Sequence, residues 1–163
     1  MSKDFSYLSR RILTGKAGRD AAALNRLGHH VVAVEPAAAL ALIGKAHAPE
    51  VEWVADRLPK LSSVRAKGEF FDFILCSAVL MSISPAHIGP SFASMAGLLK
   101  QHGKLAVTVR EATLDENTFL HTYSDNEIIA AARKAGLRCA KQTASSDALG
   151  RGMVWRSYVF TRV

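Results

Sequence analysis

Apolar residues along the chain occur in two alternating patterns, short continuous runs and longer stretches with helical spacing. The continuous runs cover residues 31–34, 71–80 and 104–110. Such runs are too short for most helices and are typical of strands that are buried on both faces of a sheet. The stretches with helical spacing alternate with the runs and lie at 19–27, 37–46 and 90–103. This alternation predicts an α/β fold with a three-layer, doubly wound and mostly parallel sheet.

Two of the predicted helices have an apolar face and a glycine stop. The first is expected to end at Gly28, and the helix at 90–103 is expected to end at Gly103, because glycine is the usual residue just after a helix. The expected apolar faces consist of Ala21, Leu24 and Leu27 in the first helix and of Phe92, Met95, Leu98 and Leu99 in the second. Each face would pack against the sheet.

The end of the chain follows a different pattern. Ser124 and Glu127 have the spacing of a capping box, which predicts that a helix begins at this point. Two strand-like segments follow, at 137–143 and 154–162, with only the loop-like segment 144–153 between them. A parallel pair would need a longer crossover, so we expect an antiparallel hairpin at the end of the sheet.

Composition is typical of a folded globular protein. The chain has 163 residues, of which 49% are hydrophobic and 21% charged, and we expect one domain over residues 1–163. No apolar stretch is long enough for a membrane helix, and the N-terminus lacks the apolar segment of a signal peptide. Cys76 and Cys139 lack metal-ligand spacing, and we expect both to be reduced thiols in a cytoplasmic protein.

The net charge of +7 raises the question of an anionic partner. Lysines and arginines gather near both ends of the chain, but no aromatic residues suited to base stacking lie among them. A solvated basic surface is therefore the favoured interpretation, and nucleic-acid binding is a weaker alternative. The sequence leaves the oligomeric state open.

Two acids follow successive predicted strands. Glu35 comes directly after the run at 31–34, and Asp56 ends the short strand-like segment at 51–56. Ligands of open α/β sheets bind at the carboxyl ends of the strands, where an acid can accept hydrogen bonds from both hydroxyls of a ribose. Each acid also has a structural interpretation, Glu35 at the start of a helix and Asp56 as a cap or turn residue.

Other candidate groups carry less information. Small residues at Cys76, Ser77 and Ala78 would let a flat ring approach the backbone, although core packing explains them as well. The six histidines have no spacing typical of a metal site. A nicotinamide-dependent reductase would share the acid after the strand, but the G-x-G-x-x-G motif is missing.

Taken in order, four segments resemble the successive motifs of class I S-adenosylmethionine-dependent methyltransferases. They are GRDAAALNRLGHHVVAVEP, VEWVADRLP, FDFILCSAVLMSI and LLKQHGKLAVTVR, and the closing hairpin is similar to the antiparallel last strand of that fold. The resemblance covers roughly residues 12–163 and depends on the ordered set more than on any one motif.

The resemblance implies S-adenosylmethionine as cofactor and assigns a role to each matching position. Glu35 would hold the ribose, Asp56 would meet the adenine amino group, and Arg57 and Leu58 would lie beside the adenine ring. The wall beneath the methionine part would consist of Cys76, Ser77 and Ala78, with Met81 near the transferred methyl group. Gly15 and Gly18 would remain as backbone contacts.

The first motif departs from the family pattern. A strand that ends in an acid and a G-x-G-x-G turn are expected, whereas Thr14 and Lys16 stand where glycines belong. Lys16 would bring a positive charge toward a sulfonium cation, Ser82 stands where relatives often have histidine, and the N-terminal segment is short.

Three functions follow from the sequence. The leading hypothesis is a methyltransferase that acts on a small molecule or an unidentified acceptor. The alternatives are a catalytically impaired binding module that keeps the fold and, less favoured, a nucleic-acid-binding protein.

Overall fold

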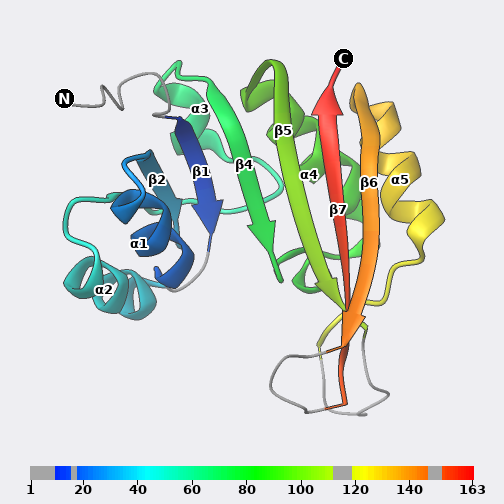
Figure 1. The fold of residues 1–163 in the computed structure, drawn as a ribbon, viewed down its shortest axis with the longest axis horizontal. Helices are drawn as coiled ribbons and strands as arrows, with labels where there is room; N and C mark the ends of the chain where they lie inside the picture. Colours follow the sequence, from blue (N-terminus) through cyan, green and yellow to red (C-terminus); the bar gives the residue numbers. More distant parts are fainter. Residues whose placement is uncertain (1–9, 16–17, 112–118, 147–151) are drawn as a thin grey trace, which may run out of the picture.

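The computed structural model describes residues 10–15, 18–111, 119–146 and 152–163. Its centre is a seven-stranded sheet with the spatial order β3-β2-β1-β4-β5-β7-β6 (Figure 1). The strands are β1 Arg11–Gly15, β2 His30–Val34, β3 Glu52–Val54, β4 Phe71–Ser77, β5 Leu99–Arg110, β6 Leu137–Ser146 and β7 Val154–Arg162. The helices are α1 Arg19–Arg26, α2 Ala38–His47, α3 Ser62–Ala66, α4 Pro85–Leu98 and α5 Asp125–Lys134, with a 3₁₀ turn at Leu80–Ser82.

Strand directions confirm the predicted fold class. The β1 strand pairs in parallel with β2 and β4, and β2 with β3 and β4 with β5 are parallel as well. Only β7 runs against its neighbours, since it is antiparallel to both β5 and β6. The predicted closing hairpin is therefore β6 and β7, and the capping box of Ser124 and Glu127 begins α5 as expected.

The helices form layers on opposite faces of the sheet. Figure 1 shows α1 and α2 in front of the β2 end of the sheet, and α4 and α5 behind its other half. Small residues such as Ala21, Ala33 and Ala48 make a minor core in front of β2. The main core lies on the α4 and α5 side and includes buried side chains of β4, β5 and β7.

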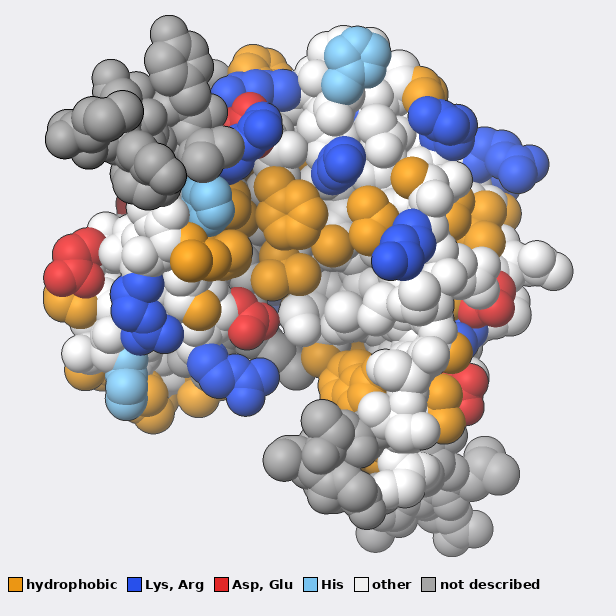
Figure 2. All heavy atoms as spheres, in the orientation of Figure 1, with side chains coloured by type: hydrophobic (Ala, Val, Ile, Leu, Met, Phe, Trp, Pro, Cys, Tyr) orange, Lys and Arg blue, Asp and Glu red, His pale blue; other side chains and the backbone are white. Residues whose placement is uncertain are grey.

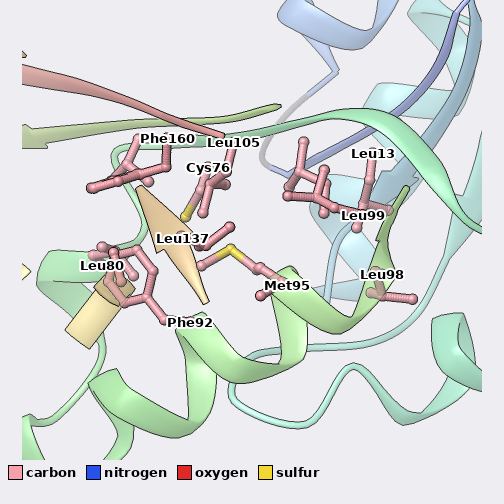
Figure 3. Close-up of a cluster of buried hydrophobic side chains, with 14 of the residues drawn as sticks. Leu13, Cys76, Leu80, Phe92, Met95, Leu98, Leu99, Leu105, Leu137 and Phe160 are labelled. Carbon is pink, nitrogen blue, oxygen red and sulfur yellow. The ribbon is translucent and has the colours of Figure 1, made fainter. Parts of the chain in front are cut away.

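Large apolar side chains fill the main core between α4 and the sheet (Figure 3). Phe92 meets Phe160 edge to face, with ring centroids 5.7 Å apart, and both rings are fully buried. Burial of such a side chain contributes about 2 to 3 kcal/mol to stability. This core anchors the strands whose ends form the site described below.

The predicted helix at 90–103 has the wrong boundaries. The helix begins earlier, at Pro85, and ends at Leu98, while Leu99 already belongs to β5 and pairs with Phe71 of β4. Strand pairing at the sheet thus overrides the helical spacing of the apolar residues. Phe92, Met95 and Leu98 are buried on the helix as predicted.

Three further boundaries differ from the predictions. The apolar run at 71–80 stops being strand at Ser77, because Ala78 has a φ of 53° and the 3₁₀ turn follows. Leu27 follows the last residue of α1 and is 73% exposed, so it is not part of the apolar face. Residues 144–146 extend β6, and 147–151 of the expected loop lie outside the described residues.

Neither cysteine forms a disulfide, and Cys76 is buried as expected, whereas Cys139 is half-buried. None of the described helices has the length and apolar character needed to cross a membrane.

Candidate functional site

A cavity of about 420 Å³ lies at the carboxyl ends of β1, β2 and β4. Six of the ten predicted site residues line it, namely Gly15, Glu35, Asp56, Arg57, Leu58 and Cys76. The other lining residues are Leu13, Thr14, Val34, Pro36, Leu40, Leu61, Ile74, Leu75, Val79, Ser82, Ile83 and Met95. Gly18, Ser77, Ala78 and Met81 do not line it.

The parallel sheet brings these segments together. Gly15 at the end of β1 pairs with Val34 at the end of β2, and Glu35 follows directly. The Glu35 backbone N–H donates to the Val54 carbonyl at the end of β3, 3.1 Å away. Three strand ends thus meet at one edge of the sheet, which is where ligands of open α/β folds bind.

Glu35 is a buried acid in an otherwise apolar wall. Glu35 is only 5% exposed, and its Oε1 accepts a hydrogen bond of 2.9 Å from the Ala37 backbone N–H. None of the described residues donates a hydrogen bond to Oε2. A carboxylate oxygen is a strong acceptor, so this oxygen is suited to accept hydrogen bonds from a ligand.

The carboxylate of Asp56 differs from that of Glu35 because both of its oxygens accept backbone hydrogen bonds. Oδ1 accepts from the Arg57 backbone N–H at 2.8 Å, and Oδ2 accepts from the Val64 backbone N–H at 3.0 Å. Val64 is buried in α3, so Asp56 satisfies one of the N–H groups that are left without a partner at the start of that helix. The acid therefore connects the loop after β3 to α3 while it lines the cavity.

The two candidate glycines also differ. A Cβ on Gly15 would have ordinary contacts, 3.6 Å from the Val34 carbonyl oxygen and 3.9 Å from Val79. Gly18 precedes α1 with a φ of 82°, and a Cβ there would lie 3.0 Å from both Gly44 Cα and the Trp53 ring. Gly18 thus allows α1 to pack against α2 and Trp53, and its backbone conformation favours glycine.

The altered first motif is described only in part. Thr14 is 2% exposed and lines the cavity, and its Oγ1 contacts the Gly15 carbonyl at 3.5 Å. Lys16, which would bring a positive charge toward a sulfonium, lies outside the described residues.

Residues at the end of β4 and just after it either line the cavity or hold the strand end in place. Cys76 lines the cavity, whereas Ser77 Oγ is 3.1 Å from Thr108 Oγ1 on β5. The Ala78 backbone N–H donates to both the carbonyl and the hydroxyl of Thr108, at 3.0 and 3.1 Å. Met81 is buried at 6% exposure. Ser77 and Ala78 therefore fix the end of β4 against β5.

Tyr123 is a supporting residue that sequence reasoning missed. Its hydroxyl donates to the carbonyl of Ile83, a residue that lines the cavity. Nearby, the His121 backbone N–H donates to the Met81 carbonyl at 2.7 Å. These bonds hold the segment after β4 from a distant part of the chain, and no local sequence pattern indicates such a pair.

Charged groups behind this segment hold Tyr123 in place. Arg156 donates to the Tyr123 carbonyl and, at 2.6 Å, to Asp125 Oδ1, which also accepts from the Tyr158 hydroxyl. The hydrogen bonds from Tyr158 and Arg156 lower the pKa of Asp125. Burial, followed by the hydrogen bond to Asp125, raises the pKa of Tyr158 far above its usual value, so Tyr158 stays protonated.

The arrangement suits binding more than acid–base chemistry. Glu35, Asp56 and Arg57 are the charged residues among those that line the cavity. Within the described part of the chain, no group of three or more histidine, cysteine or acidic side chains could hold a metal ion. A mostly apolar cavity with a few polar groups is typical of sites for small molecules and organic cofactors.

Comparison with known proteins identifies one family and several solved structures that share the fold. A family model described as methyltransferase domain matches residues 13–107. No curated protein matches the sequence.

Solved structures of methyltransferases share the fold. An S-adenosylmethionine-dependent methyltransferase from Methanosarcina mazei has a TM-score of 0.79 at 13% identity, with 95% of this chain and 93% of that chain covered. The 1,6-didemethyltoxoflavin-N1-methyltransferase of Burkholderia thailandensis was solved with 1,6-didemethyltoxoflavin and S-adenosylhomocysteine bound. It has a TM-score of 0.76 at 21% identity, with 98% of this chain and 74% of that chain covered. The N-methyltransferase NodS of Bradyrhizobium japonicum, in complex with S-adenosylhomocysteine, has a TM-score of 0.78 at 13% identity, with 97% of this chain and 81% of that chain covered.

Proposed function

Because the chain belongs to the class I S-adenosylmethionine-dependent methyltransferase family, we propose that its cavity binds S-adenosylmethionine and that the protein methylates a small molecule. The observation that carries the proposal is the position of Glu35. It is a buried acid at the end of β2, with one carboxylate oxygen that accepts nothing from the described residues, in a cavity of about 420 Å³.

The described residues fit this cofactor. The cavity volume lies in the usual range for small-molecule sites of about 300 to 1,000 Å³. Glu35 Oε2 would accept hydrogen bonds from the ribose hydroxyls, and the apolar surface of Leu58 and Leu40 would lie beside the adenine. Asp56 has further lone pairs for the adenine amino group, although each of its oxygens already accepts one hydrogen bond.

The methionine part would lie toward β4. Gly15 and Cys76 line the cavity on this side, and Ser77, Ala78 and Met81 would contribute by shaping the end of β4. Gly18 would contribute by placing the start of α1. Arg57 is exposed at the rim next to Asp56, where it would border the adenine.

When bound, the cofactor supplies a methyl group on a positively charged sulfur. That methyl group would pass to a lone pair of the acceptor, with the electrons of the carbon–sulfur bond left on sulfur and the acceptor's proton released to water. The residues of this chain would bind and align the two molecules. Alignment of bound reactants can supply much of the rate enhancement, so the lack of an acid–base pair among the described lining residues is consistent with this chemistry.

The related structures support a small-molecule acceptor. A structure with the same fold holds 1,6-didemethyltoxoflavin together with S-adenosylhomocysteine. Another is a magnesium protoporphyrin IX methyltransferase. These neighbours support a small-molecule acceptor for this chain over a macromolecular one.

Isothermal titration with S-adenosylhomocysteine tests the proposal. We expect saturable binding of one molecule per chain to the folded wild-type protein. No heat of binding, with circular dichroism showing a folded protein, would contradict it. Binding without methyl transfer to any acceptor would favour the alternative of an impaired binding module, which the Thr14 departure suggests.

A further inference from the structure

Across β4, β5 and β7, none of the described helices covers the face of the sheet opposite α4 and α5. The side chains that alternate with the buried core residues point to this face, opposite α4 and α5. In Figure 1, the described helices in front of the sheet are α1 and α2, at its β2 end. We call this surface the open face, and its residues are Phe73, Leu75, Ser77, Lys104, Ala106, Thr108, Arg110, Trp155, Ser157, Val159 and Thr161.

The open face changes in character along the strands. Around Phe73, Leu75 and Val159 it is apolar, and Figure 2 shows hydrophobic side chains gathered in the middle of this side of the molecule. Toward the carboxyl end of β5 it becomes polar, where Thr108 pairs with Ser157 and Arg110 pairs with Trp155. The polar end thus lies at the carboxyl ends of β4 and β5, beyond Leu75, which lines the cavity.

Direct contacts connect this polar end to the cavity. Leu75, which belongs to the open face, lines the cavity, and Ser77, the next residue of β4 on the same face, contacts Thr108 through their hydroxyl groups at 3.1 Å. Arg110 lies two residues beyond Thr108 on the same face of β5, which corresponds to about 7 Å along the strand. A molecule that lies over Thr108 would therefore reach from the cavity wall to Arg110.

Arg110 has an incompletely satisfied guanidinium group. Its Nε is buried and has no hydrogen-bond partner, while Nη1 donates to the Met153 sulfur at 3.3 Å, and a thioether is a weak acceptor. None of the described carboxylates lies within ion-pair distance of Arg110. By contrast, Arg156 on the opposite face forms ion pairs with Asp125 and Glu111. Among the described residues, Arg110 is therefore suited to bind a ligand's anionic group.

We propose that the acceptor is a planar aromatic acid, with its carboxylate bound by Arg110 and its ring system over Thr108 and Ser157 beside Trp155. This inference rests on the proposed methyltransferase function and specifies its substrate class. A carboxylate pairs with the fork of an arginine through two parallel hydrogen bonds, which fixes the orientation of the ring. One or two fused rings would span the rise of about 7 Å between Thr108 and Arg110 along β5.

Binding of two matched probes tests the proposal. Naphthalene-2-carboxylate and naphthalene-2-carboxamide have the same shape and differ in charge, and each is titrated by NMR into protein saturated with S-adenosylhomocysteine. We expect the carboxylate to bind at least about tenfold more tightly than the amide, because a charged pair with arginine is lost in the amide. In Arg110→Gln the preference should fall to about twofold or less, and Arg110→Lys should keep part of it.

Lys104→Gln is the matched control, since Lys104 is a cation on the same strand and the same face but at the apolar end. It should leave the preference for the carboxylate unchanged. Equal affinity for the two probes, an unchanged preference in Arg110→Gln, or binding of neither probe while S-adenosylhomocysteine binds would each overturn the proposal. Absence of S-adenosylhomocysteine binding would instead contradict the methyltransferase function, and the probes would then be titrated into the protein alone.

Discussion

Glu35 and Asp56 are acids at the ends of neighbouring parallel strands, yet the fold uses them differently. Glu35 is buried and accepts one backbone hydrogen bond, at Oε1, which leaves Oε2 for a ligand. Both oxygens of Asp56 accept backbone hydrogen bonds, from Arg57 and Val64. Position at a strand end therefore brings an acid to the cavity, but its hydrogen-bond partners decide whether it binds a ligand or supports the wall.

The two glycines show the same division. Gly15 lines the cavity and has room for a side chain, whereas Gly18 holds α1 close to Gly44 and Trp53. Each pair thus contains one residue that is available to a ligand and one that maintains the shape of the cavity. Substitution should separate the two roles, because the first kind changes ligand affinity and the second kind changes stability.

Replacement of Gly18 should have the largest effect. In Gly18→Ala the Cβ meets backbone and ring atoms at 3.0 Å, and the φ of 82° disfavours any side chain. We expect a loss of about 2 to 4 kcal/mol in the free energy of unfolding, measured by urea denaturation. Gly15→Ala, the control, should change this free energy by less than about 1 kcal/mol. Equal losses in the two variants would remove the proposed division between the glycines.

Replacement of Glu35 should act mainly on affinity. Glu35→Ala removes the free carboxylate oxygen, and we expect binding of S-adenosylhomocysteine to weaken by about 1 to 3 kcal/mol, measured by isothermal titration. Glu50→Ala is the control, since Glu50 is an exposed acid that does not line the cavity. An unchanged affinity in Glu35→Ala would show that another residue binds the ribose.

Replacement of Asp56 should act mainly on stability. Asp56→Ala leaves the buried Val64 N–H without its partner, and we expect a loss of about 1 to 2 kcal/mol in the free energy of unfolding. Its effect on affinity for S-adenosylhomocysteine should be smaller than that of Glu35→Ala. The opposite ranking of the two variants in the titration would contradict the roles assigned to the acids.

Asp125 is a third acid for this comparison, and its carboxylate accepts hydrogen bonds from the side chains of Arg156 and Tyr158. Hydrogen bonds from Tyr158 and Arg156 lower its pKa, so the stability it contributes is present above its unfolded pKa of about 3.9 and is lost as pH falls toward the folded value. The side chain is 43% exposed and screened by water, so we expect less than about 1 kcal/mol. Urea denaturation between pH 7 and 3 should show that the free energy of unfolding falls less with decreasing pH in Asp125→Asn than in wild type. The same pH dependence in both proteins would contradict this role.

Much of the fold could be predicted because the apolar runs become strands and Gly28 follows the end of α1 as expected, although Gly103 lies within β5. The boundary between α4 and β5 could not, because Leu99 pairs with Phe71, a residue far away in the sequence. The early end of β4 depends on the positive φ of Ala78, which alanine does not indicate. Local patterns therefore identify elements well, and tertiary pairing sets where they end.

The candidate site could be predicted to a similar extent. Strand ends placed Glu35 and Asp56 correctly at the cavity, because parallel strands share one carboxyl edge. The sequence does not reveal which acid keeps a free oxygen, since Val64 reaches Asp56 only through the folded loop. The support of Ile83 by Tyr123 is likewise a contact between distant segments.

The most direct test of the central claim is a binding cycle on Glu35 and the ribose. Isothermal titration would compare S-adenosylhomocysteine with its 2′,3′-dideoxy analogue, on wild-type protein and on Glu35→Ala. The account predicts that loss of the hydroxyls weakens binding to wild type by about tenfold or more and has little further effect in Glu35→Ala. Equal losses in both proteins, or no binding of S-adenosylhomocysteine to wild type, would contradict it.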